Sequence, residues 1–194
     1  MTTKTNTQNN TDTQNATPLQ TLLAELAEAK RLYLEADLAF RNIIRAGLAD
    51  HCRQEAEHAE DAHNQLRAKE HQVHDSFADL VQAGDPVTRS GYSDCHAGYV
   101  FQINKTRTKL AMQDGDARLL NGANSGEPDA LVFSPGGFCG HTSGTQRWEI
   151  KPSDLARVTV FTLRKNGRWI ETGSTLKQGH PLCAGHHHHH DFNF

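Results

Sequence analysis

Two residues with reactive side chains, Cys139 and His141, are separated by a single glycine in the middle of a glycine-rich segment. A thiol beside an imidazole can act as a nucleophile with its general base. The chain offers no identifiable third group that would orient the histidine, so one hypothesis is a weak Cys/His enzyme. The alternative, which we favour, is a chance pairing in a protein that is not an enzyme.

Soft metal ligands also occur in short-range pairs along the chain. These pairs are Cys95 with His96, Cys139 with His141, and Cys183 with His186. Zinc would suit such ligands if they met in space. However, no pair has the Cys-x-x-Cys spacing typical of zinc sites. We therefore expect no cofactor and keep zinc as an alternative.

Basic residues form two groups near expected strand turns. Lys105, Arg107 and Lys109 alternate, so we expect all three on one face of a strand. The second group flanks an Asn-Gly turn and contains Arg164, Lys165, Arg168 and the adjacent Trp169. Such residues could neutralise phosphates and stack a base. The alternative is a set of edge-strand cations that discourage aggregation.

The segment 121–147 is predicted to be a long loop without secondary structure of its own, which is typical of functional loops. Its glycines include Gly136, Gly137 and Gly140, with Phe138 and Trp148 as expected anchors. Backbone amides of this loop, together with Arg147, could grip a phosphate-bearing nucleotide. Alternatively, the loop only caps one end of a barrel.

These candidates lie in a part of the chain that differs in composition from what precedes it. Fourteen of the fifteen glycines occur from Gly84 onward, whereas residues 18–83 contain only Gly47. Residues 18–83 are therefore predicted to be a helical arm, with Thr17 and Pro18 at its start. Two apolar stripes offset at Gly47 indicate two helices joined near residues 46–50. The first stripe contains Leu19, Leu22, Leu26, Ala29, Tyr33, Ala36, Phe40 and Ile43, and the second Cys52, Ala56, Ala59, His63, Leu66, Glu70, Val73, Phe77 and Leu80.

Small residues hold five of the seventeen stripe positions, so the hairpin buries little by itself and needs a partner to cover it. We expect either a homo-oligomer formed through the arm or an intramolecular hairpin packed on the second domain. A single uninterrupted helix is the third alternative. Residues 1–17, rich in Thr, Asn and Gln, are predicted to be a disordered tail.

Residues 84–194 alternate in the manner of strands. Expected hairpins lie at 98–113 and 158–170, the second with a type I′ turn at Asn166-Gly167. We predict an α+β protein: a helical hairpin or coiled-coil arm, then a small antiparallel β domain with its own core. An SH3-like barrel and a compact sheet are the two forms considered.

Charge and cysteine usage exclude some classes of protein. The net charge of −3 divides into −5 for residues 18–83 and +2 for residues 84–194. A strongly basic nucleic-acid binder is excluded, so any such contact must use a local patch. No apolar run reaches the ~20 residues of a membrane span. With four dispersed cysteines and no signal-peptide pattern, we expect a cytoplasmic protein without a membrane partner.

Three segments of the second domain have distinctive sequences: residues 121–130 (NGANSGEPDA), 134–148 (SPGGFCGHTSGTQRW) and 161–169 (FTLRKNGRW), followed by the acidic-aromatic ending Asp191–Phe194. Together they resemble a family of small proteins encoded by phages and other mobile elements. The resemblance covers residues 84–194 only, and the family has no assigned activity. The run His186 to His190, where the family mixes basic and aromatic residues, is interpreted as native.

The resemblance implies a phage or mobile-element protein acting on a host process, including defence. We therefore expect a non-enzymatic binding protein whose β domain engages nucleic acid or a host protein. The alternative is a small-ligand protein, binding a nucleotide at the 121–147 loop.

Overall fold

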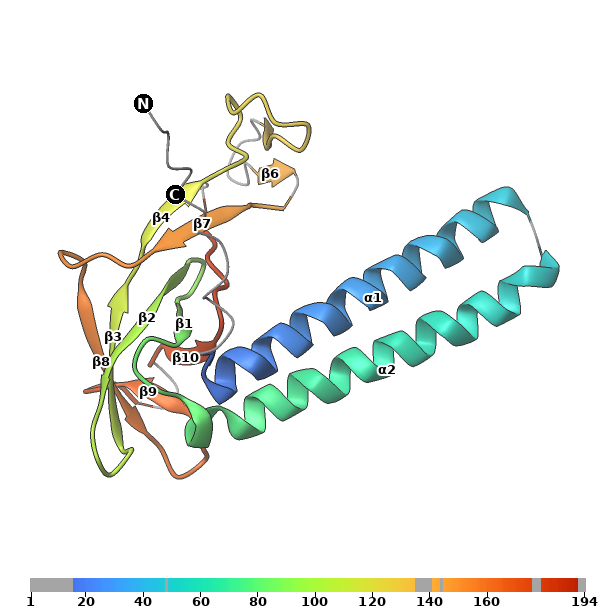
Figure 1. Ribbon diagram of the computed structural model, residues 1–194. Helices are drawn as coiled ribbons and strands as arrows, with labels where there is room; N and C mark the ends of the chain where they lie inside the picture. The colour runs from blue at the N-terminus through green and yellow to red at the C-terminus, as the bar shows by residue number, and fades with distance from the viewer. Residues whose placement is uncertain (1–15, 48, 135–140, 144, 176–178, 192–194) are drawn as a thin grey trace, which may run out of the picture.

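The protein consists of a helical hairpin followed by a closed β-barrel (Figure 1). The computed structural model describes residues 16–47, 49–134, 141–143, 145–175 and 179–191. The helices are α1 (Pro18–Ala46) and α2 (Ala49–Leu80). The strands are β1 (Pro86–Ser90), β2 (Cys95–Ile103), β3 (Lys109–Asp114), β4 (Asp116–Leu119), β5 (Val132–Ser134), β6 (His141–Ser143), β7 (Trp148–Lys151), β8 (Val158–Leu163), β9 (Trp169–Glu171) and β10 (Pro181–Ala184). The predicted α+β fold with an N-terminal helical arm is confirmed.

Capping residues set the ends of α1. Thr17 accepts a hydrogen bond from the Gln20 amide, and the Gln20 side chain accepts one from the Thr17 amide. This reciprocal pair is a capping box. At the other end Gly47 adopts a left-handed conformation with φ of 69°, which ends the helix and begins the turn to α2.

The two helices run antiparallel and project away from the barrel as an arm (Figure 1). Every predicted stripe residue of α1 is buried or half-buried, as expected. In α2 the prediction was wrong at Glu70, which is exposed, whereas the ring of the exposed His63 lies 5.2 Å from that of Tyr33 on α1. The seam also passes through the buried Ala62 and the half-buried Lys69, which pairs with Glu25 of α1. Among the described residues, no helix is long and apolar enough to cross a membrane.

Six strands close the barrel in the order β1-β10-β9-β8-β3-β2, with every neighbouring pair antiparallel. The last strand of the chain, β10, pairs with the first, β1, through Val87 opposite Ala184. Closure therefore joins the two ends of the domain. Strand β4 pairs with β7 and β5 with β6 in two smaller sheets at one end of the barrel.

One hydrophobic core is shared by the arm and the barrel. Leu19 and Leu22 from α1, together with Phe77 from α2, belong to the same buried cluster as barrel residues such as Phe161 and Trp169. The expectation of a separate core in the β domain was wrong, because the base of the arm covers the apolar opening of the barrel.

Asp85 fixes this junction and is completely buried. Its carboxylate accepts hydrogen bonds from the Thr17 hydroxyl and from the Gln82 amide, while its carbonyl accepts one from the Val100 amide at 2.9 Å. One residue thereby connects the start of α1, the end of α2 and strand β2.

The β8–β9 turn differs from the predicted type I′ geometry. That geometry requires positive φ at both central residues, yet Gly167 has φ of 79° and Asn166 is not among the residues with positive φ. The Gly167 amide donates to the Arg164 carbonyl, so a four-residue turn ends at a left-handed glycine. The β2–β3 turn has the same plan, with Arg107 left-handed at φ of 52°.

Candidate functional site

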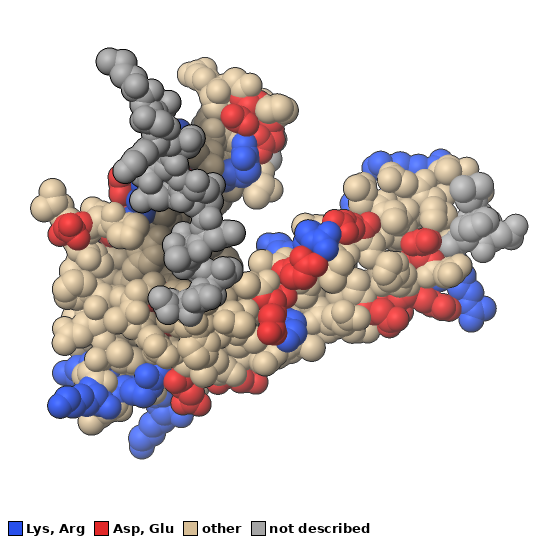
Figure 2. Space-filling view, in the orientation of Figure 1, with Lys and Arg blue, Asp and Glu red and all other residues tan. Residues whose placement is uncertain are grey.

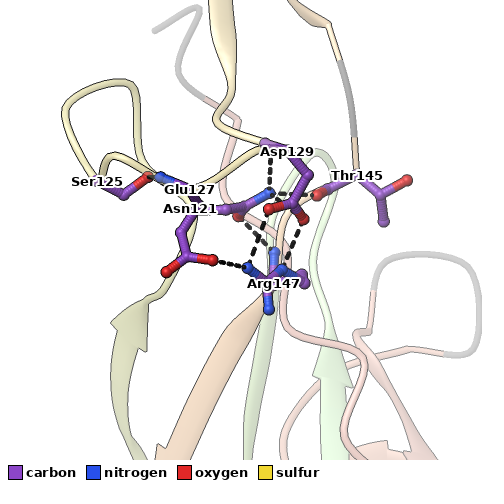
Figure 3. Close-up of polar contacts among 6 residues, drawn as sticks. All are labelled: Asn121, Ser125, Glu127, Asp129, Thr145 and Arg147. Carbon is purple, nitrogen blue, oxygen red and sulfur yellow. Dashed lines mark hydrogen bonds and ion pairs between the residues drawn. The ribbon is translucent and has the colours of Figure 1, made fainter.

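The base of the 121–147 excursion is organised around a buried asparagine (Figure 3). The Asn121 side-chain amide donates to the carbonyls of Asp129 and Thr145, both at 2.9 Å, and its oxygen accepts from the Arg147 amide at 2.8 Å. These three bonds connect the two sides of the excursion. The loop carries the short strands β5 and β6, so the prediction of a loop without secondary structure was wrong.

Arg147 is occupied by acidic residues of this loop. Its guanidinium pairs with Asp129 at 2.7 Å and with Glu127 at 3.1 Å (Figure 3). These carboxylates raise the pKa of Arg147. The guanidinium thus closes the loop from within, and its expected role as a phosphate or partner ligand stays a prediction.

The described residues do not include the side chains of the proposed Cys/His pair. Cys139, together with Gly136, Gly137, Phe138 and Gly140, lies outside the residues that the structure describes. For His141 only its backbone position in β6 is described. The nucleophilic pair therefore stays a prediction.

Four cations gather at the end of the barrel where two hairpin turns lie together. Strand β3 pairs with β8, placing Lys109 opposite Thr162, so the β2–β3 and β8–β9 turns lie side by side. Lys105, Lys109, Lys165 and Arg168 are all exposed, and within the described part of the chain none of them forms an ion pair. Figure 2 shows Lys and Arg gathered at this end, with Asp and Glu distributed along the arm.

Two arginines of the predicted groups serve the fold instead. The Arg107 Nη2 atom donates to the carbonyls of Ala78, Asp79 and Val81, at 3.1, 2.7 and 2.8 Å. Lys105 and Arg107 lie in the turn before β3, so the expected strand face of Lys105, Arg107 and Lys109 was wrong. Arg164 donates to the Ser174 carbonyl at 2.8 Å.

Neither tryptophan is available as an exposed stacking platform. Trp169 is 0% exposed in the barrel core, which contradicts its predicted place beside the cations. Trp148 is half-buried, with its Nε1 donating to the Gln146 side chain at 2.9 Å and its ring 4.5 Å from that of His188. It anchors the C-terminal histidines beside the excursion.

Phe101 is an exposed aromatic residue on β2, the strand that pairs with β3, and it was not among the predicted site residues. It occupies the bulge of β2 between Val100 and Gln102 and is 60% exposed. Beside it, Gln102, Lys109, Ala111 and Val160 line a hollow of 240 Å³ on the outer face of the barrel. Strand alternation could have found Phe101, because Val100 points into the core and its neighbour must point out.

Residues His186 to His190, called the histidine strap below, lie along β1 and β2. His189 pairs with Cys95 through two backbone hydrogen bonds of 2.8 and 3.0 Å. His188 accepts from the Ala97 amide, and the His186 ring packs edge-on against Tyr99 at 4.8 Å. Burial lowers the pKa of both His186 and His188. The described residues contain no group of three His, Cys, Asp or Glu side chains that could hold a metal ion, and the zinc hypothesis stays a prediction.

No family model, no curated protein and no solved structure matches this chain. The resemblance of residues 84–194 to phage and mobile-element proteins therefore stays a prediction. The exposed cations of the barrel could contact phosphate oxygens, and the exposed ring of Phe101 could stack on a base.

Proposed function

We propose that this chain is a non-enzymatic binding protein of a phage or other mobile element whose barrel binds single-stranded nucleic acid. The observation that carries the proposal is the group of exposed cations Lys105, Lys109, Lys165 and Arg168, which form no ion pair in the described part of the chain, on a barrel that also exposes the ring of Phe101 on strand β2. Lysine and arginine contact phosphates without regard to sequence, and an aromatic ring stacks any base.

A single strand suits this surface because its bases are free to reach an aromatic ring. Lys105, Lys165 and Arg168 lie in two turns and Lys109 begins β3, so none of them is on a helix that could enter a groove. Phe101 is on β2, the strand that pairs with β3. The acidic arm extends away from this end and restricts the contact to the barrel (Figure 2). Action against a host process rests on the family resemblance.

The test measures binding of a fluorescently labelled single-stranded oligonucleotide by anisotropy at several salt concentrations. Each phosphate neutralised on a single strand contributes about −0.7 to the slope of log K against log salt, so four cations predict a slope of about −3. Replacing all four cations with alanine should abolish binding of the oligonucleotide. A matched control replaces Lys30, Arg67, Arg118 and Lys151, which changes the net charge equally elsewhere.

Phe101→Ala tests the stacking contact separately. Stacking is worth about 1–3 kcal/mol per base, so affinity should fall by about tenfold while the salt slope stays the same. Tyr92→Ala, at a fully exposed aromatic residue, serves as the control. Equal binding by the four-cation variant and the wild type would refute the proposal. If the four cations bound a host protein and the oligonucleotide did not bind, the partner of this surface would be an acidic protein and not nucleic acid.

A further inference from the structure

One face of the helical arm is a long groove. Two hollows, of 850 and 480 Å³, share Leu32 and Gln65 and so form one continuous depression between α1 and α2. Its floor is built from small apolar side chains, namely Ala24, Ala29, Ala36, Ala39, Ala62 and Ala68. Small residues let another helix approach closely, with larger side chains inserted between them.

The groove is acidic. Five carboxylates line it, Glu25, Glu28, Glu35, Glu55 and Asp61, against the single ammonium of Lys69. An occupant that matches this groove must carry apolar side chains for the alanines and cations for the carboxylates.

The same chain contains a matching surface on another side of α1. The positions involved are spaced four, three, four, three and four residues apart and form one stripe: Ala27, Arg31, Leu34, Leu38, Arg41 and Arg45. Leu34 and Leu38 are 54% and 56% exposed. Within one chain Arg31 pairs with Glu28 and Glu35, two of the groove carboxylates, and Arg41 pairs with the half-buried Asp37. Such pairs between mostly exposed side chains are weak and exchangeable. This surface, the arginine stripe, has no acidic member.

We propose that the arginine stripe of one copy docks in the acidic groove of a second copy. Like-with-like pairing is disfavoured, because it would place three arginines against three arginines, or five carboxylates against five. At about 100° per residue, Leu32 in the groove and Leu34 in the stripe lie roughly 160° apart around α1. Each copy therefore offers different faces to two neighbours, and such a head-to-tail contact produces a ring or an open filament rather than a two-fold dimer.

The test uses the full chain in sedimentation velocity over a range of concentrations. We expect species larger than a dimer that grow with concentration. The stripe variant Leu34→Glu with Leu38→Glu, and the groove variant Ala24→Arg with Ala68→Arg, should each be monomeric. All four positions are exposed, so helix content and thermal midpoint should match the wild type. The control Leu155→Glu, at a residue 98% exposed outside the arm, should assemble normally.

Mixing the two monomeric variants distinguishes this contact from any symmetric one. The stripe variant keeps an intact groove, and the groove variant keeps an intact stripe. Their equimolar mixture should therefore form a heterodimer and stop at that size. A two-fold dimer that mixing does not restore would overturn the proposal, as would wild-type protein that stays monomeric up to about 100 μM. Binding of a basic amphipathic peptide by a monomeric wild type would show that the groove serves another protein.

Discussion

Replacing Arg107 should loosen the attachment of the arm to the barrel. Its guanidinium contacts three carbonyls at the end of α2, which have no partners within the helix. A hydrogen bond to a charged group contributes about 1.5–3 kcal/mol, but Nη2 carries two hydrogens and lies at a partly exposed site. We therefore assign about 2 kcal/mol to the whole contact.

The backbone conformation of Arg107 lowers stability and so opposes the gain from its side-chain contact. A left-handed conformation costs an L residue about 1–2 kcal/mol, a penalty that glycine escapes. Arg107→Ala loses the contact and keeps the strain, so stability should fall by about 2 kcal/mol. Arg107→Gly loses the contact and relieves the strain, so the loss should be about 1 kcal/mol. For a chain of this size, these losses correspond to decreases in Tm of about 4–8 °C and 2–4 °C.

Urea unfolding followed by circular dichroism measures both values, with hydrogen exchange at residues 78–81 as a local readout. Lys105→Ala, in the same turn but exposed, should change stability by less than about 0.5 kcal/mol. If the glycine variant were less stable than the alanine variant, the strain argument would fail. If both matched the wild type, the carbonyl contact would contribute nothing.

Two further predictions concern the histidine strap and the loop. Burial lowers the pKa of His186 and His188, so below the unfolded pKa of about 6.5 the unfolded chain binds more protons than the folded chain. The contribution of these two histidines to the free energy of unfolding should be complete above that pH and should decrease as the pH falls below it. The urea midpoint should therefore be lower at pH 5.5 than at pH 7.5. Replacing both His186 and His188 with glutamine should remove part of this difference. Asn121→Ala should cost about 2 kcal/mol by leaving three part-buried backbone groups without their partner, whereas Asn124→Ala, at an exposed residue, should be neutral by the same unfolding assay.

The sequence was sufficient for features that depend on neighbouring residues. Thr17, Gly47 and the apolar spacing of α1 locate the arm because capping and periodicity act within a few residues. Glu70 was misplaced because the spacing alone does not show which of two adjacent residues faces the other helix, and it is the half-buried Lys69 that pairs with Glu25 of α1.

The contacts at the site that the sequence did not reveal join residues far apart in the chain. Arg107 reaches carbonyls 26 to 29 residues earlier in the chain, and Arg147 meets carboxylates 18 and 20 residues away. No local pattern reports such partners. Trp169 was misjudged for a simpler reason: the turn before it suggested exposure, whereas strand alternation places Arg168 outside and Trp169 inside.

The position of β10 has a consequence for biosynthesis. A ribosome releases α1 and α2 before β10, the strand that seals the barrel against β1. At about 5–20 residues per second, roughly 10–30 s separate the synthesis of Leu22 from that of β10, and until then Leu19 and Leu22 have no completed barrel interior to enter. The apolar base of the nascent arm is therefore exposed during this time. In a shortened protein that lacks β10, that base would stay exposed to chaperones and proteases.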